Sequence, residues 1–472
     1  MSELNSSKPA IPAWLIWIQC IAFVVLYGVW ILPEIVGFRN TALVVGVLAG
    51  LYPIYLYRNC FFQRRATPLW LMIGLFTWAI FHLVFLSQDY AAQFLEFKRI
   101  WKYAAIGAIF ALGLGLSLVS NGLMVRESRI AWGPLKGPYY PVIYFGLCLP
   151  LLIYLLKYCL TVYGEVFGIW VPASLKIYFE SQPFYVPKTD YVAFCLPPFA
   201  IALGQIQVLL VSKFKLRGGQ YLAIFVYLAT LAATLFLFNI QNIKNGMAYA
   251  AVCVLIFIIS ILFRMMSSKP SKNALIIFIT IGIFMGALYS HVQKNESWRT
   301  LAADSKVAFQ LDKYQHWKYA GAQGYPNNEN GKMVSVTNYE RAAWFKVGLQ
   351  LAIRNPLGYG LIEDSFKKMV KARWPEASTN LSHSHSGWLD LILAIGIPGF
   401  IFLLGALLFA LKQAKEVCQP WQSLVIWALL ANSLLWISTE VSATVTFSAL
   451  IFWVSWASGL TLLRSANKAS EA

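Results

Sequence analysis

The sequence predicts an all-α polytopic membrane protein with about 12 transmembrane helices and one long polar loop between the ninth and tenth of them. Hydrophobic residues make up 59% of the 472 residues and charged residues only 12%, whereas soluble domains are about a quarter charged. The 18 Trp and 24 Tyr residues suit the aromatic belts at the two membrane surfaces. Most of the polar sequence is gathered in one stretch, residues 292–386.

Each predicted span is close to the ~20 residues needed to cross the hydrocarbon core. The spans run approximately over residues 13–32, 41–57, 67–86, 101–120, 139–160, 190–211, 220–238, 246–264, 273–291, 387–408, 420–438 and 440–463. They predict three parts: spans 1–9 in residues 1–291, a helical loop in residues 292–386, and spans 10–12 with a short cytoplasmic tail in residues 387–472. The first ten residues lack the features of a cleaved signal peptide, so we expect the first span to be retained.

The basic residues predict the orientation of the spans. With a cytoplasmic N-terminus, every inner connection is rich in Lys and Arg. Short outer connections, such as residues 33–40 and 239–245, contain almost no Lys or Arg. The inner residues are Arg58, Arg64, Arg65, Arg126, Arg129, Lys136, Lys213, Lys215, Arg217, Arg264, Lys269, Lys272, Lys412, Lys415, Arg464 and Lys468. This topology places the long loop outside, and it explains much of the net charge of +18 without a nucleic-acid partner.

The long loop has its own predicted structure. An amphipathic segment covers about residues 300–319, and a turn or lid follows at residues 321–332. The run Thr337-Asn338-Tyr339-Glu340 has the spacing of a capping box and predicts a helix over about residues 338–353. A second helix, about residues 363–373, carries a basic face. Helices of this kind can lie across the mouth of a membrane bundle.

Two histidines mark the junction between this loop and the tenth span. His385 can accept a hydroxyl proton at neutral pH, and His383 would share its side in an extended segment. Arg341 lies in the first turn of the predicted helix, where a guanidinium and helix amides could face one anion. Lys244 is the single cation of a short outer connection. The alternatives are an interfacial histidine without a role, a solvated arginine and a snorkelling lysine.

Several kinds of chemistry lack support in the sequence. The seven cysteines are scattered and form neither a disulfide framework nor a metal-binding spacing. The outer loops contain no acidic pair or Asp-x-Asp element, so we expect no catalytic metal and no other cofactor. A phosphate-binding Gly-x-x-x-x-Gly-Lys-Ser/Thr sequence is also missing, so ATP is not expected to drive the protein directly.

Four motifs in the second half of the chain resemble the bacterial O-antigen ligase and O-antigen polymerase superfamily. They are His383-Ser384-His385-Ser386-Gly387-Trp388-Leu389, Gly396-Ile397-Pro398-Gly399, Arg341-Ala342-Ala343-Trp344 and Asn355-Pro356-Leu357-Gly358-Tyr359-Gly360. Two departures stand out: Ser386 replaces the usual Asn after the histidine, and Lys244 occupies the place of a family arginine. Lysine keeps the positive charge there but loses the bidentate fork.

The resemblance implies a GT-C-like, metal-independent, inverting glycosyltransferase in the bacterial inner (plasma) membrane, with its active site facing the periplasm. The implied donor is a glycan on undecaprenyl pyrophosphate, and the implied acceptor of a ligase is lipid A-core. In this interpretation Arg341 and Lys244 bind the pyrophosphate, and His385 orients or deprotonates the acceptor hydroxyl. His383 and Glu440, the latter at the last outer hairpin, are possible supporting residues.

Three alternatives to a ligase stay open from the sequence. A polymerase would extend another lipid-linked glycan, and a protein O-oligosaccharyltransferase would use a Ser or Thr side chain. The short segment after the last predicted span favours a ligase over the protein-modifying enzymes, which tend to carry a further polar region there. A transporter of lipid-linked glycans would use the same membrane grooves and basic loop without making a bond.

Overall fold

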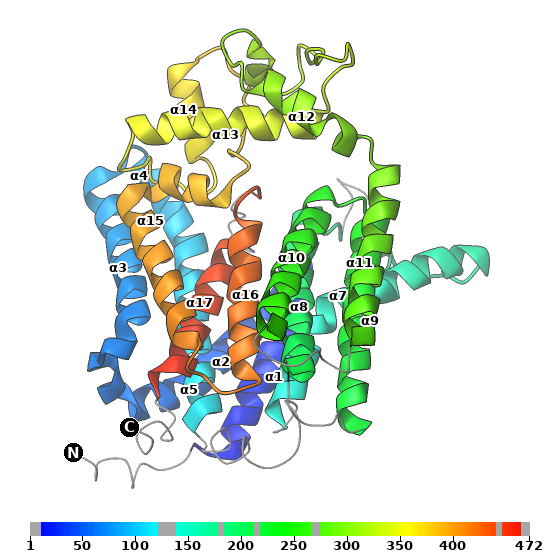
Figure 1. Cartoon of the computed structure of the whole chain (residues 1–472). Coiled ribbons are helices and arrows are strands. Elements are labelled where there is room, and N and C mark those ends of the chain that lie inside the picture. The colour runs from blue at the N-terminus through cyan, green and yellow to red at the C-terminus, as the bar shows by residue number, and fades with distance from the viewer. Residues whose placement is uncertain are drawn as a thin grey trace.

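The computed structural model describes residues 11–120, 138–177, 184–211, 218–266, 274–439 and 446–463. These residues form an α-helical bundle with a helical layer across one end (Figure 1), and no β-strand occurs among them. The predicted all-α class is therefore confirmed.

Twelve apolar helical stretches account for the bundle. They contain α1 (Ala13–Val29), α2 (Val36–Leu56), α3 (Thr67–Phe81), α5 (Lys102–Ser120), α7 (Tyr139–Val166), α8 (Lys188–Val211), α9 (Gly218–Ile240), α10 (Lys244–Met266), α11 (Ala274–Lys294), α15 (Gly387–Ala414), α16 (Trp421–Leu435) and α17 (Thr446–Leu462). Within the described residues, nine stretches are long and apolar enough to cross a membrane, whereas α1, α16 and α17 are shorter apolar helices. The count of about 12 complete spans stays a prediction.

The fourth span begins earlier than predicted. Helix α4 (Tyr90–Glu96), the π-helical turn Phe97–Trp101 and α5 continue one another, so this stretch runs from Tyr90 rather than from residue 101. The cause is local, because the Asp89 carboxylate accepts a hydrogen bond from the Ala92 backbone N–H at 3.2 Å and caps the helix.

The centre of the bundle is closed by small residues that bring helix backbones together. A Cβ on Gly113 of α5 would lie 2.4 Å from the Cα of Gly50 in α2, and a Cβ on Gly459 of α17 would lie 2.4 Å from the Leu112 carbonyl oxygen. Close backbone approach of this kind is typical of helix packing in membranes. Helix α17 is buried along its described length, because it packs between α5, α15 and α16.

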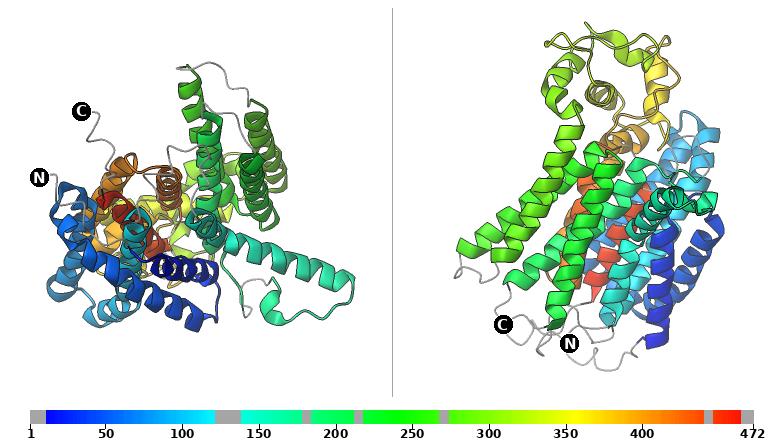
Figure 2. Two further views of the ribbon diagram at one scale, coloured as in Figure 1. Left: turned by 90° about the horizontal axis from the view of Figure 1, so that it is seen from below. Right: turned by 90° about the vertical axis from the view of Figure 1, so that its right-hand side faces the viewer.

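Residues 295–386 form the layer across one end of the bundle, which we call the cap (Figures 1 and 2). Its helices are α12 (Ser297–Ala308), α13 (Val336–Arg354) and α14 (Ser365–Arg373), with a 3₁₀ turn at Gln315–Tyr319. The cap has a hydrophobic core of its own, which includes Trp317, Tyr339, Trp344 and Leu381. The two helices predicted in the second half of the loop are thus confirmed.

The predicted capping box at the start of α13 is wrong. Ser335 occupies the N-cap position and makes no side-chain capping bond, so Thr337 already lies inside the helix. Glu340 instead accepts a hydrogen bond of 2.5 Å from the Tyr325 hydroxyl, and burial raises the pKa of Glu340. The segment predicted as one amphipathic run over residues 300–319 is divided into α12 and the 3₁₀ turn.

Helix α15 breaks below the cap, and a turn of the cap fills the break. Gly396 has φ of 73° and ψ of −179°, which interrupts the helical hydrogen bonds around it. The carbonyls of Leu393 and Ala394 accept hydrogen bonds of 2.7 Å from the backbone N–H groups of Tyr359 and Gly360. The turn after α13 therefore replaces the missing helical partners and fastens the cap to α15.

Candidate functional site

The segment that joins the cap to α15 carries both candidate histidines. His385 adopts φ of +60°, a left-handed conformation that is uncommon outside glycine and is often found at functional sites. Its ring stacks on the indole of Trp344 with centroids 5.1 Å apart and planes within 5°. The His383 ring lies edge-on to His385 at 4.4 Å. The two imidazoles therefore share one side of the segment, and both are partly exposed.

A buried carboxylate holds the loop between the two histidines. Asp390, in the first turn of α15, accepts hydrogen bonds from the Ser384 backbone N–H at 2.9 Å and the Ser384 hydroxyl at 2.6 Å. Ser384 is fully buried and Asp390 is 5% exposed, so water competes little for these bonds. The bonds fix the backbone on which both histidines are mounted.

The start of α15 is also fixed against the end of α16. The Ser386 hydroxyl and the Trp388 backbone N–H both donate to the Trp436 carbonyl at 3.3 Å. A Cβ on Gly387 would lie 3.0 Å from the Trp436 ring, so the two helices meet closely here. The serine that replaces the family asparagine is thus bound to the neighbouring helix.

Arg341 reaches the same end of α16 from the cap. Its guanidinium donates to the Ser438 carbonyl at 2.8 Å. Arg341 lies one helical turn before Trp344, and Gly348 follows one turn later on the same face. A Cβ on Gly348 would lie 3.0 Å from the Cβ of Ser384. One face of α13 therefore presents the guanidinium, the indole that stacks on His385 and the contact with the histidine segment.

Lys244 begins α10 and lies beneath the cap. Its ammonium group donates to the Asn338 side-chain oxygen at 2.5 Å and to the Ser297 carbonyl at 3.0 Å, and it lies 5.0 Å from the Trp298 ring centroid. Arg341 is close enough for the two positive charges to oppose each other. The neighbouring Asn245 donates to the Ser438 carbonyl at 3.4 Å, the same acceptor that Arg341 uses.

A buried aspartate supports this cationic region. Asp304 accepts hydrogen bonds from the side chains of Asn328, Thr300 and Asn338 and from the Ser335 backbone N–H. Burial opposes the ionisation of Asp304, but these hydrogen bonds together lower its pKa below the ordinary value. Asp304 therefore stays charged and orients Asn338 toward Lys244.

Neither Arg341 nor Lys244 forms an ion pair with any residue that the structure describes. Asp304 offsets part of the charge of Lys244 through space, but the two cations together still give a net positive charge that suits an anion. Glu340, the sequence neighbour of Arg341, is engaged with Tyr325 instead. Glu440, the remaining candidate, lies outside the described residues.

Some residues of this region were not singled out from the sequence. Asp390 could have been identified from the sequence, because an ionisable residue inside an apolar span is rare and commonly functional. His291 of α11 is fully buried against Trp298, and neither ring nitrogen has a hydrogen-bond partner among the described residues. Ser438 could not have been identified from the sequence, because it contacts Arg341 through its backbone carbonyl rather than its side chain.

The described residues contain no group of three or more His, Cys, Asp or Glu side chains placed to hold a metal ion. The segment that carries His385 offers the hydroxyls of Ser384 and Ser386, and the cations Arg341 and Lys244 lie at the same end of the bundle. Two cations that could hold an anionic group and a partly exposed imidazole are thus found on the same side of the bundle.

Comparison with known proteins gives a family match. Residues 228–404 match the model of the family described as O-antigen ligase, which confirms the resemblance seen in the motifs. The match contains Lys244, Arg341, His383 and His385 and indicates a glycosyltransferase of the ligase and polymerase type that handles lipid-linked glycans. No curated protein matches the chain.

Proposed function

From the O-antigen ligase match over residues 228–404, we propose that this multi-pass membrane protein transfers a glycan from undecaprenyl pyrophosphate to lipid A-core. The reaction takes place at the periplasmic face of the bacterial inner membrane, beneath the cap. The observation that carries the proposal is the meeting of Arg341 and the His385 segment at the end of α16, where both are hydrogen-bonded to or packed on residues 436–439.

Arg341 and Lys244 bind the pyrophosphate of the donor. The bond to the Ser438 carbonyl occupies one N–H of Arg341, and the rest of the planar fork is suited to two phosphate oxygens. Lys244 adds a point charge at the N-terminus of α10, where the helix dipole also favours an anion. Together they stabilise the negative charge that grows on the leaving pyrophosphate, so no metal ion is needed for that task.

His385 acts on the acceptor. Its imidazole takes the proton of an acceptor sugar hydroxyl while that oxygen attacks the anomeric carbon of the donor. The bond from the anomeric carbon to the pyrophosphate oxygen breaks, its electron pair leaves with undecaprenyl pyrophosphate, and the imidazolium releases its proton to water. One direct displacement inverts the anomeric configuration.

The surroundings of His385 act by positioning it. The stack on Trp344 fixes the plane of the ring, and the Asp390–Ser384 bonds fix its backbone. Small errors in the placement of a reacting group cost large factors in rate. His383 and Glu440 are proposed as supporting residues at the same site, and the polyprenyl chain lies along the exposed apolar faces of the helices.

A polymerase remains the principal alternative, followed by a protein O-oligosaccharyltransferase, because all three use the same donor chemistry. Purified, reconstituted protein incubated with a lipid-linked glycan and separate acceptors distinguishes them. A ligase shifts the lipid A-core band on a gel, a polymerase makes a ladder of longer lipid-linked chains, and a transporter makes neither product. A ladder without a shifted lipid A-core band would contradict the proposed acceptor.

A further inference from the structure

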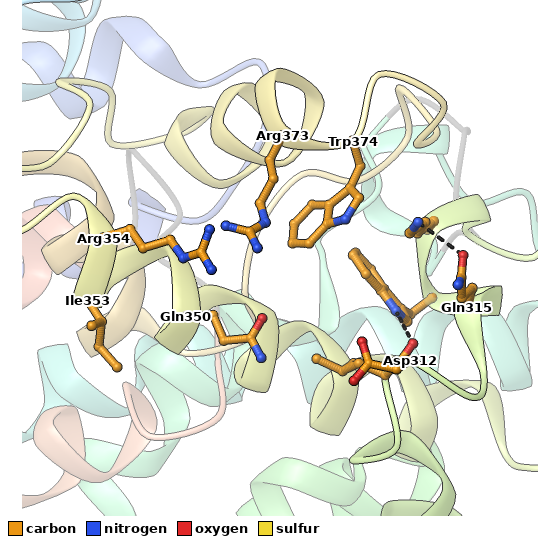
Figure 3. Close-up of a pocket in the computed structure, with 10 residues that line it drawn as sticks. Asp312, Gln315, Gln350, Ile353, Arg354, Arg373 and Trp374 are labelled. Carbon is orange, nitrogen blue, oxygen red and sulfur yellow. Dashed lines mark hydrogen bonds between the residues drawn. The ribbon is translucent and has the colours of Figure 1, made fainter.

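The cap contains a concave site on residues that the proposed donor site does not use. A pocket of about 410 Å³ opens between the 3₁₀ turn, the C-terminal half of α13 and the end of α14 (Figure 3). We call it the cap pocket. It is lined by Leu311, Asp312, Gln315, Trp317, Lys318, Gln350, Ile353, Arg354, Arg373 and Trp374.

Two tryptophans form one wall of the cap pocket. The rings of Trp317 and Trp374 meet edge to face with centroids 5.0 Å apart. Trp317 is buried and Trp374 is half-buried, so the pair is fixed but not fully covered. Trp374 is the ring that a ligand can reach. An indole face is electron-rich and therefore attracts the weakly positive C–H groups on the apolar face of a sugar ring.

Two arginines approach each other across the opening. In Figure 3 the guanidinium groups of Arg354 and Arg373 point toward one another. Within the described part of the chain, neither forms an ion pair, and Arg373 also lies over the Trp374 ring at 4.8 Å. Both arginines are exposed, so water screens much of their mutual repulsion, and two guanidinium groups placed in this way are suited to a carboxylate or a phosphate.

The remaining polar groups suit hydroxyls rather than further charge. Asp312, Gln315 and Gln350 line the same pocket and offer acceptors and donors for neutral partners. Lys318 is already occupied, since it donates to Gln315 at 3.1 Å and pairs with Glu376 at 2.7 Å. The Asp312 carboxylate, across the pocket from the two arginines in Figure 3, disfavours a densely charged polyanion. The combination therefore matches a ligand with several hydroxyls and one anionic group.

The cap pocket is connected to the candidate catalytic segment. The Trp317 carbonyl accepts a hydrogen bond of 3.0 Å from the indole N–H of Trp344, and Trp344 stacks on His385. Arg354 and Arg341 lie on the same helix, roughly 20 Å apart at 1.5 Å per residue. At 3.6 residues per turn Arg354 also lies on a different side of α13 from Arg341, so a glycan that occupied both sites would pass around the helix as well as along it.

We propose that the cap pocket binds an anionic sugar residue, one that carries a carboxylate or a phosphate, and so holds a glycan substrate at a distance from the reacting centre. Its role in transfer rests on the proposed function, whereas its binding of an anionic sugar does not. The anionic sugar belongs either to the acceptor core or to the donor glycan, and both present the same chemistry to the two arginines.

Binding is tested first, without any transfer reaction. Saturation-transfer NMR on the full-length protein in detergent would measure glucose 6-phosphate, glucuronic acid and neutral glucose, each at millimolar concentration. We expect both anionic sugars to bind at least about tenfold more tightly than glucose, and Arg373→Gln and Arg354→Gln each to weaken them by about tenfold. Arg299→Gln removes an exposed cap arginine outside the pocket and should leave binding unchanged. Equal binding of glucose, or unchanged binding in both pocket variants, would overturn the proposal.

The transfer assay then assigns the source of the sugar. Arg373→Gln and Trp374→Ala should raise the KM of one substrate while kcat changes little, because the pocket is remote from the reacting atoms. A raised acceptor KM assigns the pocket to the core, and a raised donor KM assigns it to the donor glycan. Unchanged KM values for both substrates, in a protein whose transfer still depends on His385, would overturn the role of the pocket and leave the proposed function standing.

Discussion

The imidazole of His385 lies face to face on the indole of Trp344, with ring centroids 5.1 Å apart. Trp344 is one turn from Arg341 on α13, so a helix of the cap connects the candidate base to the candidate phosphate ligand. Arg341 also meets the end of α16 through the Ser438 carbonyl, and Ser386, the residue after His385, meets it through the Trp436 carbonyl. A displacement of α13 would therefore disturb both residues together, and the cap is expected to act as part of the site.

Trp344→Phe tests whether the stack positions His385. Phenylalanine keeps most of the apolar contacts but loses ring area and the N–H bond to the Trp317 carbonyl. We expect kcat for glycan transfer to fall by about tenfold or more while donor affinity is nearly unchanged. Steady-state kinetics measure this, with thermal unfolding as a check on folding. A normal kcat in the folded variant would show that the stack has no positioning role.

Asp390→Ala tests the anchor of the histidine segment. Loss of the carboxylate leaves the buried Ser384 N–H and hydroxyl without their acceptor, which costs about 1–3 kcal/mol of stability. We expect kcat to fall by about a hundredfold. Asp390→Asn should recover much of the rate, because its amide oxygen can still accept from Ser384. Equal loss in both variants would assign the defect to the charge of Asp390 and contradict a positioning role.

Arg341→Ala should weaken donor binding by about tenfold to a hundredfold, because a charge-assisted hydrogen bond contributes about 1.5–3 kcal/mol. Arg341→Lys should recover part of the affinity, since it keeps the charge without the fork. Lys244→Gln should act in the same direction. Binding of a radiolabelled lipid pyrophosphate to reconstituted protein measures these effects, with Arg299→Gln as the matched control. Wild-type affinity and rate in Arg341→Ala would remove the pyrophosphate assignment.

Asp304 predicts a pH dependence of cap stability. Because the folded-state pKa of Asp304 is lowered, its contribution is present at neutral pH, above the unfolded pKa of about 3.9. That contribution is lost as the pH falls through the lower folded-state pKa. Hydrogen exchange of α12 and α13 should therefore quicken at acidic pH, after correction for intrinsic rates.

Asp304→Asn is the matched variant for that experiment. It should already exchange faster at neutral pH and show a smaller further change on acidification. Glu329→Gln, which removes an exposed carboxylate paired with Lys306, serves as the control and should resemble the wild type. A wild-type pH profile in Asp304→Asn would show that another group controls the cap.

The sequence predicted the helices better than their ends. Long apolar runs give the spans, because only a helix satisfies its own backbone in lipid. The start of the fourth span was wrong, since the Asp89 cap is a local polar contact that hydropathy does not register. The capping box was wrong because the helix begins earlier, with Ser335 at the N-cap. The Ser335 backbone N–H donates to Asp304 of α12, a tertiary contact that the local sequence does not show. The Gly396 break depends on partners from the turn after α13, which no local pattern reveals.

The candidate site was predictable to the extent that it depends on side chains in motifs. His385, Arg341 and Lys244 come from patterns and from the family resemblance, and the structure brings Arg341 and Lys244 to one end of the bundle with the His385 segment. The face-to-face stack on Trp344 could not be predicted, because it depends on the left-handed backbone of His385. Backbone acceptors such as the Ser438 carbonyl cannot be predicted from the residue type, because every residue has a backbone carbonyl.

The most direct test of the account is the transfer rate of a reconstituted His385 variant measured beside its donor affinity. His385→Asn is a useful partner for His385→Ala, because asparagine tolerates the left-handed backbone and so keeps the segment in place. The account predicts that both variants bind the lipid-linked donor as the wild type does and transfer no glycan to lipid A-core. Transfer at the wild-type rate by either folded variant would contradict it.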